Sequence, residues 1–127
     1  MNLADAFAHF GDRLEQPHRQ TAALASDGSL VLLLWAQLYD AATSSYTDWT
    51  EAYEYPFGMR YLVQGALTLR RPVRIVHPDY KGPMPDGRLP FSPGNRYFPR
   101  NEVVGHIVSY SPSERGRFVV LCKEVGA

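Results

Sequence analysis

The run that decides the fold is Leu30-Val31-Leu32-Leu33-Leu34-Trp35, which follows the dipeptide Asp27-Gly28. All six residues are apolar and none alternates with a polar one, which predicts a strand buried on both faces. Asp-Gly between two extended segments predicts a hairpin, because such a turn requires positive φ at its centre. We therefore expect residues 20–26 to pair with a strand over 30–39 at the centre of the core.

Helical patterns lie on both sides of this hairpin. Residues 2–10 have apolar side chains at helical spacing, with Asn2 placed to cap the first turn. Residues 59–69 show the same spacing, and Pro72 follows them. Asp48 precedes Glu51 by three positions, a capping-box spacing that predicts one or two helical turns before Pro56.

Three further strands are predicted over residues 73–77, 103–110 and 117–125. Between the first two, residues 78–99 contain six prolines and three glycines, which predicts a long loop. Such loops are often functional. Together these elements predict an α+β fold formed as a single domain over residues 1–127. Its expected architecture is a small, strongly curved mixed sheet or partly open β-barrel of about five strands, covered by two or three helices.

Composition excludes several classes of protein. Charged residues make up 20% and aromatic residues 13% of the 127 residues, which are globular values rather than those of a disordered chain. The longest apolar run, residues 30–36, is far shorter than the roughly 18 residues of a membrane span. The N-terminus has no signal-peptide pattern, and the single cysteine, Cys122, agrees with a reducing compartment. We expect a cytoplasmic protein without membrane contact.

Residues 46–61 are unusually aromatic, with six rings in 16 positions. Rings presented from a loop can stack on a planar ligand such as a nucleobase, at about 1 to 3 kcal/mol per base. The candidate ligand-binding residues are Tyr46, Trp49, Tyr53 and Tyr55, with Asp48 as a hydrogen-bond acceptor. The alternative is that these rings hold an irregular segment against the core, with their hydroxyls reaching water.

The zero net charge of the chain hides an asymmetry. Residues 1–64 hold eight acidic and three basic residues, whereas residues 65–127 hold five acidic and ten basic ones. Arginine dominates the basic stretch, and its planar fork suits phosphates and base edges. The candidate nucleic-acid-binding residues are Arg60, Arg70, Arg71, Arg74, Arg96 and Arg100. The alternative is that these arginines belong to several separate solvated faces.

Evidence for catalysis is thin. His77, Asp79 and His106 could supply metal ligands, but no metal-binding spacing accompanies them. Cys122 would act as a nucleophile with His106 only if its thiol were exposed and its pKa lowered. No nucleophile elbow, phosphate-binding loop or dinucleotide motif is present, so we expect no catalytic residue, metal or cofactor.

The order of these parts resembles a group of short bacterial proteins of unassigned role. The resemblance rests on Ala25-Ser26-Asp27-Gly28 leading into the apolar strand with Trp35, and on Tyr97-Phe98-Pro99-Arg100. More distantly, the chain is similar to the PUA-like superfamily, which includes SRA- and EVE-type domains that flip a modified base into an aromatic pocket. The similarity implies base recognition rather than catalysis, with Tyr46, Trp49 and Tyr53 as pocket walls.

Three functions are consistent with the sequence. The first is a non-enzymatic module that binds DNA or RNA and recognises a modified or flipped base between aromatic rings and arginines. The second is an accessory or inhibitor subunit that docks a protein partner through its acidic half and its aromatic segment. The third is a small hydrolase that uses His77, Asp79, His106 or Cys122.

Overall fold

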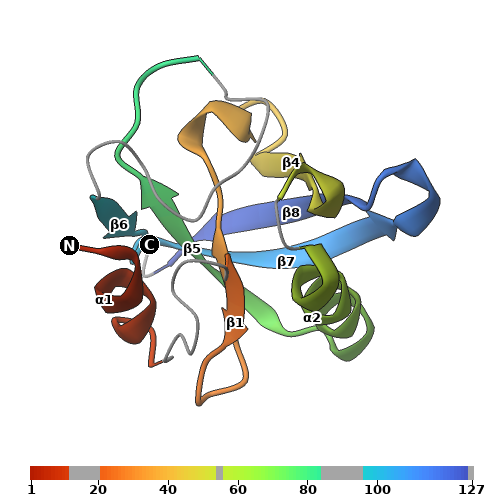
Figure 1. Ribbon diagram of the computed structural model, residues 1–127, viewed down its shortest axis with the longest axis horizontal. Coiled ribbons are helices and arrows are strands. Elements are labelled where there is room, and N and C mark those ends of the chain that lie inside the picture. Colours follow the sequence, from red (N-terminus) through yellow and green to blue (C-terminus); the bar gives the residue numbers. More distant parts are fainter. Residues whose placement is uncertain (12–20, 54–55, 84–95, 126–127) are drawn as a thin grey trace.

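The computed structural model describes residues 1–11, 21–53, 56–83 and 96–125. In this part of the chain two α-helices accompany one mixed sheet of eight strands (Figure 1). Seven strands follow the order β1-β2-β5-β7-β8-β4-β3, and β6 pairs with β5 outside that path. The sheet is open, with β1 and β3 at its two ends. The expected α+β class with a mixed sheet is confirmed, although the sheet has more strands than predicted.

The predicted hairpin forms at one end of the sheet. Strands β1 (Ala22–Leu24) and β2 (Leu30–Leu33) pair antiparallel across a turn in which Gly28 has a φ of +88°. The Asp27 carboxylate accepts a hydrogen bond from the Ser29 N–H at 2.9 Å, which stabilises the turn. Strand β2 also pairs in parallel with β5 (Pro72–Pro78).

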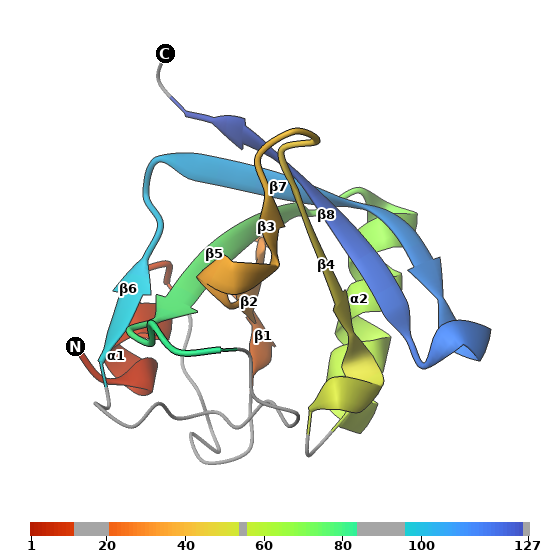
Figure 2. The same ribbon diagram turned by 90° about the horizontal axis from the view of Figure 1, so that it is seen from above.

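The two helices cover opposite faces of β2, as Figure 2 shows. Helix α1 (Leu3–Ala8) packs against Val31 and Leu33, and its first turn is capped by the Asn2 side chain as predicted. Helix α2 (Pro56–Leu69) packs against Leu30 and Leu32 on the concave face, and it begins three residues earlier than its apolar pattern indicates. Strand β2 is therefore buried on both faces, as expected.

The C-terminal hairpin of β7 (Val103–Ser111) and β8 (Arg117–Glu124) also agrees with the sequence prediction. A short 3₁₀ turn, η3 (Pro112–Glu114), joins the two strands. A register shift between Ile107 and Ser109 interrupts the pairing, so the expected simple alternation along β7 does not hold over its whole length. Strand β6 (Tyr97–Pro99) occupies the end of the stretch expected to be a loop, and residues 84–95 of that stretch lie outside the described residues.

The prediction was wrong between residues 34 and 52. The strand expected over 30–39 ends at Leu33, and a 3₁₀ turn, η1 (Ala36–Leu38), follows it. Strands β3 (Tyr39–Asp40) and β4 (Ser45–Trp49) form a hairpin that was not predicted, and β4 pairs with β8. Asp48 does not start an α-helix, and only a 3₁₀ turn, η2 (Thr50–Ala52), follows it. Its buried carboxylate instead accepts hydrogen bonds from the Trp49 N–H at 2.8 Å and the Tyr53 hydroxyl at 2.6 Å. Those contacts take the place of the predicted helix cap.

Within the described residues, neither helix has the length and apolar character that crossing a bilayer would require.

Candidate functional site

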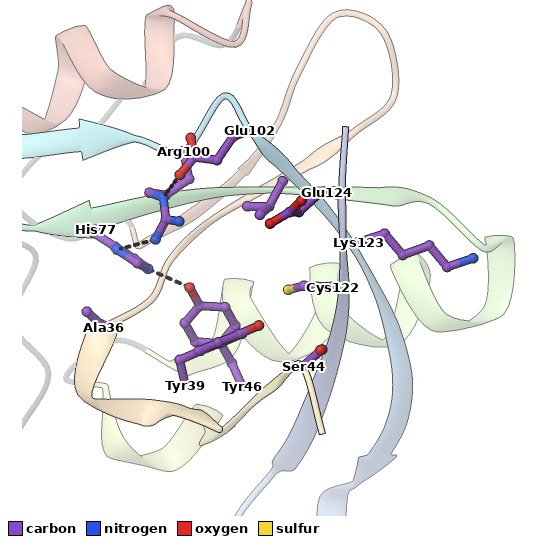
Figure 3. Close-up of a pocket in the computed structure, with 11 residues that line it drawn as sticks. Ala36, Tyr39, Ser44, Tyr46, His77, Arg100, Glu102, Cys122, Lys123 and Glu124 are labelled. Carbon is purple, nitrogen blue, oxygen red and sulfur yellow. Dashed lines mark hydrogen bonds and ion pairs between the residues drawn. The ribbon is translucent and has the colours of Figure 1, made fainter. Parts of the chain in front are cut away.

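A cavity of about 450 Å³ with polar and aromatic side chains in its walls lies among the described residues (Figure 3). Its walls come from β3, β4, the C-terminal half of β5, the segment after β6, the start of β7 and the end of β8. On β5, Val73 and Ile75 belong to the core under α2, and His77 follows on the same face. The cavity therefore begins where the apolar core gives way to a polar residue.

A chain of hydrogen bonds runs along one wall of this cavity. The Tyr46 hydroxyl lies 2.7 Å from His77 Nε2, and the Arg100 guanidinium lies 3.2 Å from His77 Nδ1. Arg100 also forms an ion pair with Glu102. Figure 3 shows that this chain joins β4, β5 and the segment after β6 along the left side of the cavity.

Burial and the neighbouring Arg100 set the protonation state of His77, and its hydrogen-bond partners set which ring nitrogen carries the proton. Burial first, and the Arg100 charge second, lower its pKa from 6.5 to about 4, so the imidazole is neutral at physiological pH. A guanidinium only donates hydrogen bonds, so Nδ1 must be the acceptor and we assign the single ring proton to Nε2. Nε2–H then donates to the Tyr46 oxygen. The hydroxyl proton of Tyr46 is left to donate to another acceptor, and burial raises the pKa of this hydroxyl above its usual value.

The rest of the cavity combines an aromatic wall with carboxylates. Tyr39 is 41% exposed, and its ring centroid lies 5.0 Å from that of Tyr46 at an interplanar angle of 54°. The Glu102 carboxyl has a pKa below its usual value, first because it accepts a hydrogen bond from the backbone N–H of Glu102 itself and second because of the Arg100 side chain. Glu124 reaches the cavity from β8, whereas the Lys123 side chain extends away from it in Figure 3.

Cys122 lines the cavity as a protonated thiol. Burial raises its pKa to about 11, which opposes the thiolate form that a nucleophile needs. Cys122 pairs with Gly105 and His106 pairs with Leu121, so Cys122 and His106 face opposite sides of the sheet. The hypothetical Cys122/His106 pair is therefore not formed. Among the described residues, no group of three or more His, Cys, Asp or Glu side chains could hold a metal ion.

The predicted aromatic residues do not share one pocket. Tyr46 lines the cavity, but Tyr53 and Asp48 lie in the core, where the Tyr53 hydroxyl oxygen also lies 3.0 Å from the Leu33 carbonyl oxygen. Trp49 is half-buried at the end of β4, and Tyr55 lies outside the described residues. The alternative interpretation, that aromatic rings hold this segment against the core, fits the Tyr53 ring, although the Tyr53 hydroxyl lies in the core and does not reach water as that interpretation expected.

The predicted basic residues are dispersed. Arg60 forms an ion pair with Glu51, and Arg74 lies over the Phe10 ring on the α1 side of the sheet. Arg71 donates to the Gly28 carbonyl in the β1–β2 turn at 3.0 Å. Of the six arginines, only Arg100 lines the cavity, while Arg70 and Arg96 are exposed elsewhere in the chain.

Sequence analysis missed three groups that shape this site. His77 was considered only as a metal ligand or a hydrolase residue, and neither Tyr39 nor Glu124 was considered at all. A histidine that follows Val73 and Ile75 at period two was the available signal, because that spacing places an imidazole on a core-facing side of a strand. Tyr39 and Glu124 gave no comparable signal, since their positions depend on how β3 and β8 pair.

No protein-family model, curated protein or solved structure was found to match this chain. Its function is therefore inferred from the cavity itself.

Proposed function

We propose that this protein is a non-enzymatic binding module whose cavity holds a planar, nitrogen-containing ring such as a nucleobase. The ring comes either from a free nucleotide or from a base extruded from a DNA or RNA strand. The observation that carries the proposal is the hydrogen-bonded chain Tyr46–His77–Arg100 opening into a cavity of about 450 Å³ beside the Tyr39 ring.

The polar groups of the cavity match the edge of a base. Tyr46 supplies a hydroxyl donor, and the carboxylates of Glu102 and Glu124 supply acceptors. A base edge carries donors and acceptors side by side, and carboxylates accept hydrogen bonds from exocyclic amino groups. The Tyr39 ring offers a face for stacking, which is worth about 1 to 3 kcal/mol per base. The volume also lies within the range of ordinary ligand pockets, roughly 300 to 1,000 Å³.

Binding fits these groups better than catalysis. A Cys122 thiol with a pKa of about 11 is protonated at neutral pH, and a His77 imidazole with a pKa of about 4 is a weak base there. A general base works best when its pKa lies near the operating pH. The cavity is therefore suited to hold a ligand rather than to transform it.

The dispersed arginines bear on the source of the ring. A surface that binds an extended nucleic-acid strand requires several phosphate contacts, and these contacts make the affinity fall steeply as the salt concentration rises. Arg100 alone lies at the cavity, whereas Arg71 and Arg74 lie near the other end of β5, by the β1–β2 turn. We expect a shallow salt dependence, with the ring rather than the backbone supplying most of the binding free energy.

The test is a calorimetric titration in two arms, each at low and at physiological ionic strength. One arm uses mononucleotides of the common bases. The other uses single- and double-stranded DNA and RNA oligonucleotides with plain and modified bases. An affinity for mononucleotides that is comparable to the affinity for oligonucleotides indicates that the ligand is a free nucleotide. Binding of oligonucleotides but not of mononucleotides indicates an extruded base. A preference for modified bases would agree with the PUA-like resemblance.

Two variants locate the binding site. Tyr39→Ala removes the stacking face and should weaken binding by about five- to 150-fold, the equivalent of 1 to 3 kcal/mol. Tyr61→Ala is the matched control, because Tyr61 is a tyrosine on α2 that is 81% exposed and does not line this cavity. Absence of binding in both arms at low salt would overturn the proposal, as would equal effects of the two substitutions.

A further inference from the structure

We propose that the groove between β1 and α2 binds an extended peptide segment of a partner protein. The segment adds a strand to the outer edge of β1, inserts an apolar side chain against α2, and places an acidic residue next to Arg71. This site is separate from the nucleobase cavity and does not depend on it.

The edge of β1 offers backbone groups to such a strand. The Leu33 N–H donates to the Thr21 carbonyl at 2.9 Å, and the Ala25 N–H donates to the Ser29 carbonyl at 2.8 Å. Because bonded residues alternate along an antiparallel pair, Ala22 and Leu24 direct their N–H and C=O groups away from β2. No strand of the described residues pairs with that side of β1. Strand addition to an open sheet edge is a recurring mode of peptide recognition.

The groove itself is apolar. It encloses about 310 Å³ between Leu24 of β1 and one face of α2, which carries Tyr61, Gly65 and Leu69 at helical spacing. Tyr61 is 81%, Leu69 62% and Leu24 40% exposed. A Cβ added at Gly65 would meet no atom within 4 Å, so the floor of the groove has room for an incoming side chain. Exposed apolar side chains gathered around a groove are typical of an interaction site.

The charge of the groove selects the partner. Arg71 lines it, and the hydrogen bond from Arg71 Nη1 to the Gly28 carbonyl uses one of its guanidinium N–H groups and leaves the others to bind a partner. None of the described residues that line the groove is acidic. An Asp, a Glu or a C-terminal carboxylate on the segment would therefore complement Arg71. Pairing of this edge with β1 of a second copy of the chain fits less well, because Ala22–Leu24 carries no acidic residue.

The decisive substitution is Gly65→Leu, which places a branched side chain on the floor of the groove. Leucine has a much higher helix propensity than glycine, so the variant should fold at least as well as the parent chain. Gly58→Leu is the matched control, because Gly58 lies on the same helix, also has open space around it, and does not line the groove.

The experiment selects phage-displayed random peptides of about eight residues, a typical strand length, on the full chain. Selected sequences should alternate apolar and polar residues and carry an acidic residue near one end. Their affinity should fall at least about tenfold on Gly65→Leu and stay unchanged on Gly58→Leu. N-methylation of alternate peptide amides should abolish binding, because it removes the donors that a β-strand needs.

Three outcomes would overturn the proposal. One is a selection that yields no peptide preferring the parent chain to the Gly65→Leu variant. Another is a peptide that binds equally well when N-methylated, which would exclude strand addition. The third is a concentration-dependent dimer that Gly65→Leu dissociates and that no selected peptide competes with, because this would assign the groove to a second copy of the chain.

Discussion

The protonation of His77 allows a quantitative test of the cavity. His77 is only 7% exposed, and its pKa falls from 6.5 to about 4 on folding. Above pH 6.5 the imidazole is neutral in both the folded and the unfolded chain. Between pH 6.5 and about 4 the unfolded chain takes up a proton that the folded chain does not. The contribution of His77 to the free energy of unfolding is therefore fully present above pH 6.5 and is lost as the pH falls towards 4.

The magnitude follows from the shift. Each pKa unit corresponds to 1.36 kcal/mol, so the wild-type chain should lose about 3 kcal/mol of stability through this residue between pH 7 and pH 4. The variant His77→Gln does not titrate, and its amide can still donate to Tyr46 and accept from Arg100. Subtracting the two pH profiles removes the contribution of every other titrating group that the substitution does not disturb.

Urea unfolding of both proteins across this pH range measures the difference. The two profiles should be close to parallel near pH 7 and should diverge as the pH falls, with the wild type losing more stability. Profiles that remain parallel down to pH 4 would refute the buried, neutral imidazole. The ¹⁵N shifts of His77 provide a second test, because a proton on Nδ1 would contradict the assignment of Tyr46 as a donor into the cavity.

Three further predictions concern the core. Gly105→Ala should destabilise the chain by about 1 to 3 kcal/mol in urea unfolding, because the new Cβ would lie 2.5 Å from Val120 Cγ1, and an unchanged midpoint would contradict this packing. Tyr53→Phe should cost about 1.5 to 3 kcal/mol by removing a hydrogen bond to the buried Asp48 carboxylate, and a loss below 0.5 kcal/mol would show that this bond is unimportant. Cys122 should react with iodoacetamide at pH 8 about a hundredfold more slowly in the folded than in the urea-unfolded chain, since its pKa is raised from 9.0 to about 11, and equal rates would disprove the burial.

The parts of the fold that could be predicted are those with strong local signals. The apolar run from Leu30 to Trp35 predicted a strand buried on two faces, and the two helices pack against opposite faces of β2. Asn2 caps its helix because capping depends only on residues within the first turn. Asp48 shows the limit of such signals. Its capping-box spacing is real, but the pairing of β4 with β8 and the contact with Tyr53 override it, and both depend on tertiary structure.

The candidate site was predicted only in fragments. Tyr46 and Arg100 were both selected, for stacking and for phosphate contact respectively, and both line the cavity. The residue that joins them, His77, lies 31 positions from Tyr46 and 23 from Arg100. No local pattern brings such residues together, because their approach requires β5 to enter the sheet beside β2 and β7.

The parallel pairing of β2 with β5 also bears on how the chain reaches its native state. Strands β1 and β2 are adjacent in sequence and can form early as a hairpin, and so can β7 and β8. By contrast, β5 meets β2 only after the chain has closed a long excursion through β3, β4 and α2. Closing such a loop costs entropy before its contacts form, and non-local pairing of this kind slows folding. We therefore expect assembly of the cavity wall between Tyr46 and His77 to be a late event, coupled to the docking of the two hairpins onto β5.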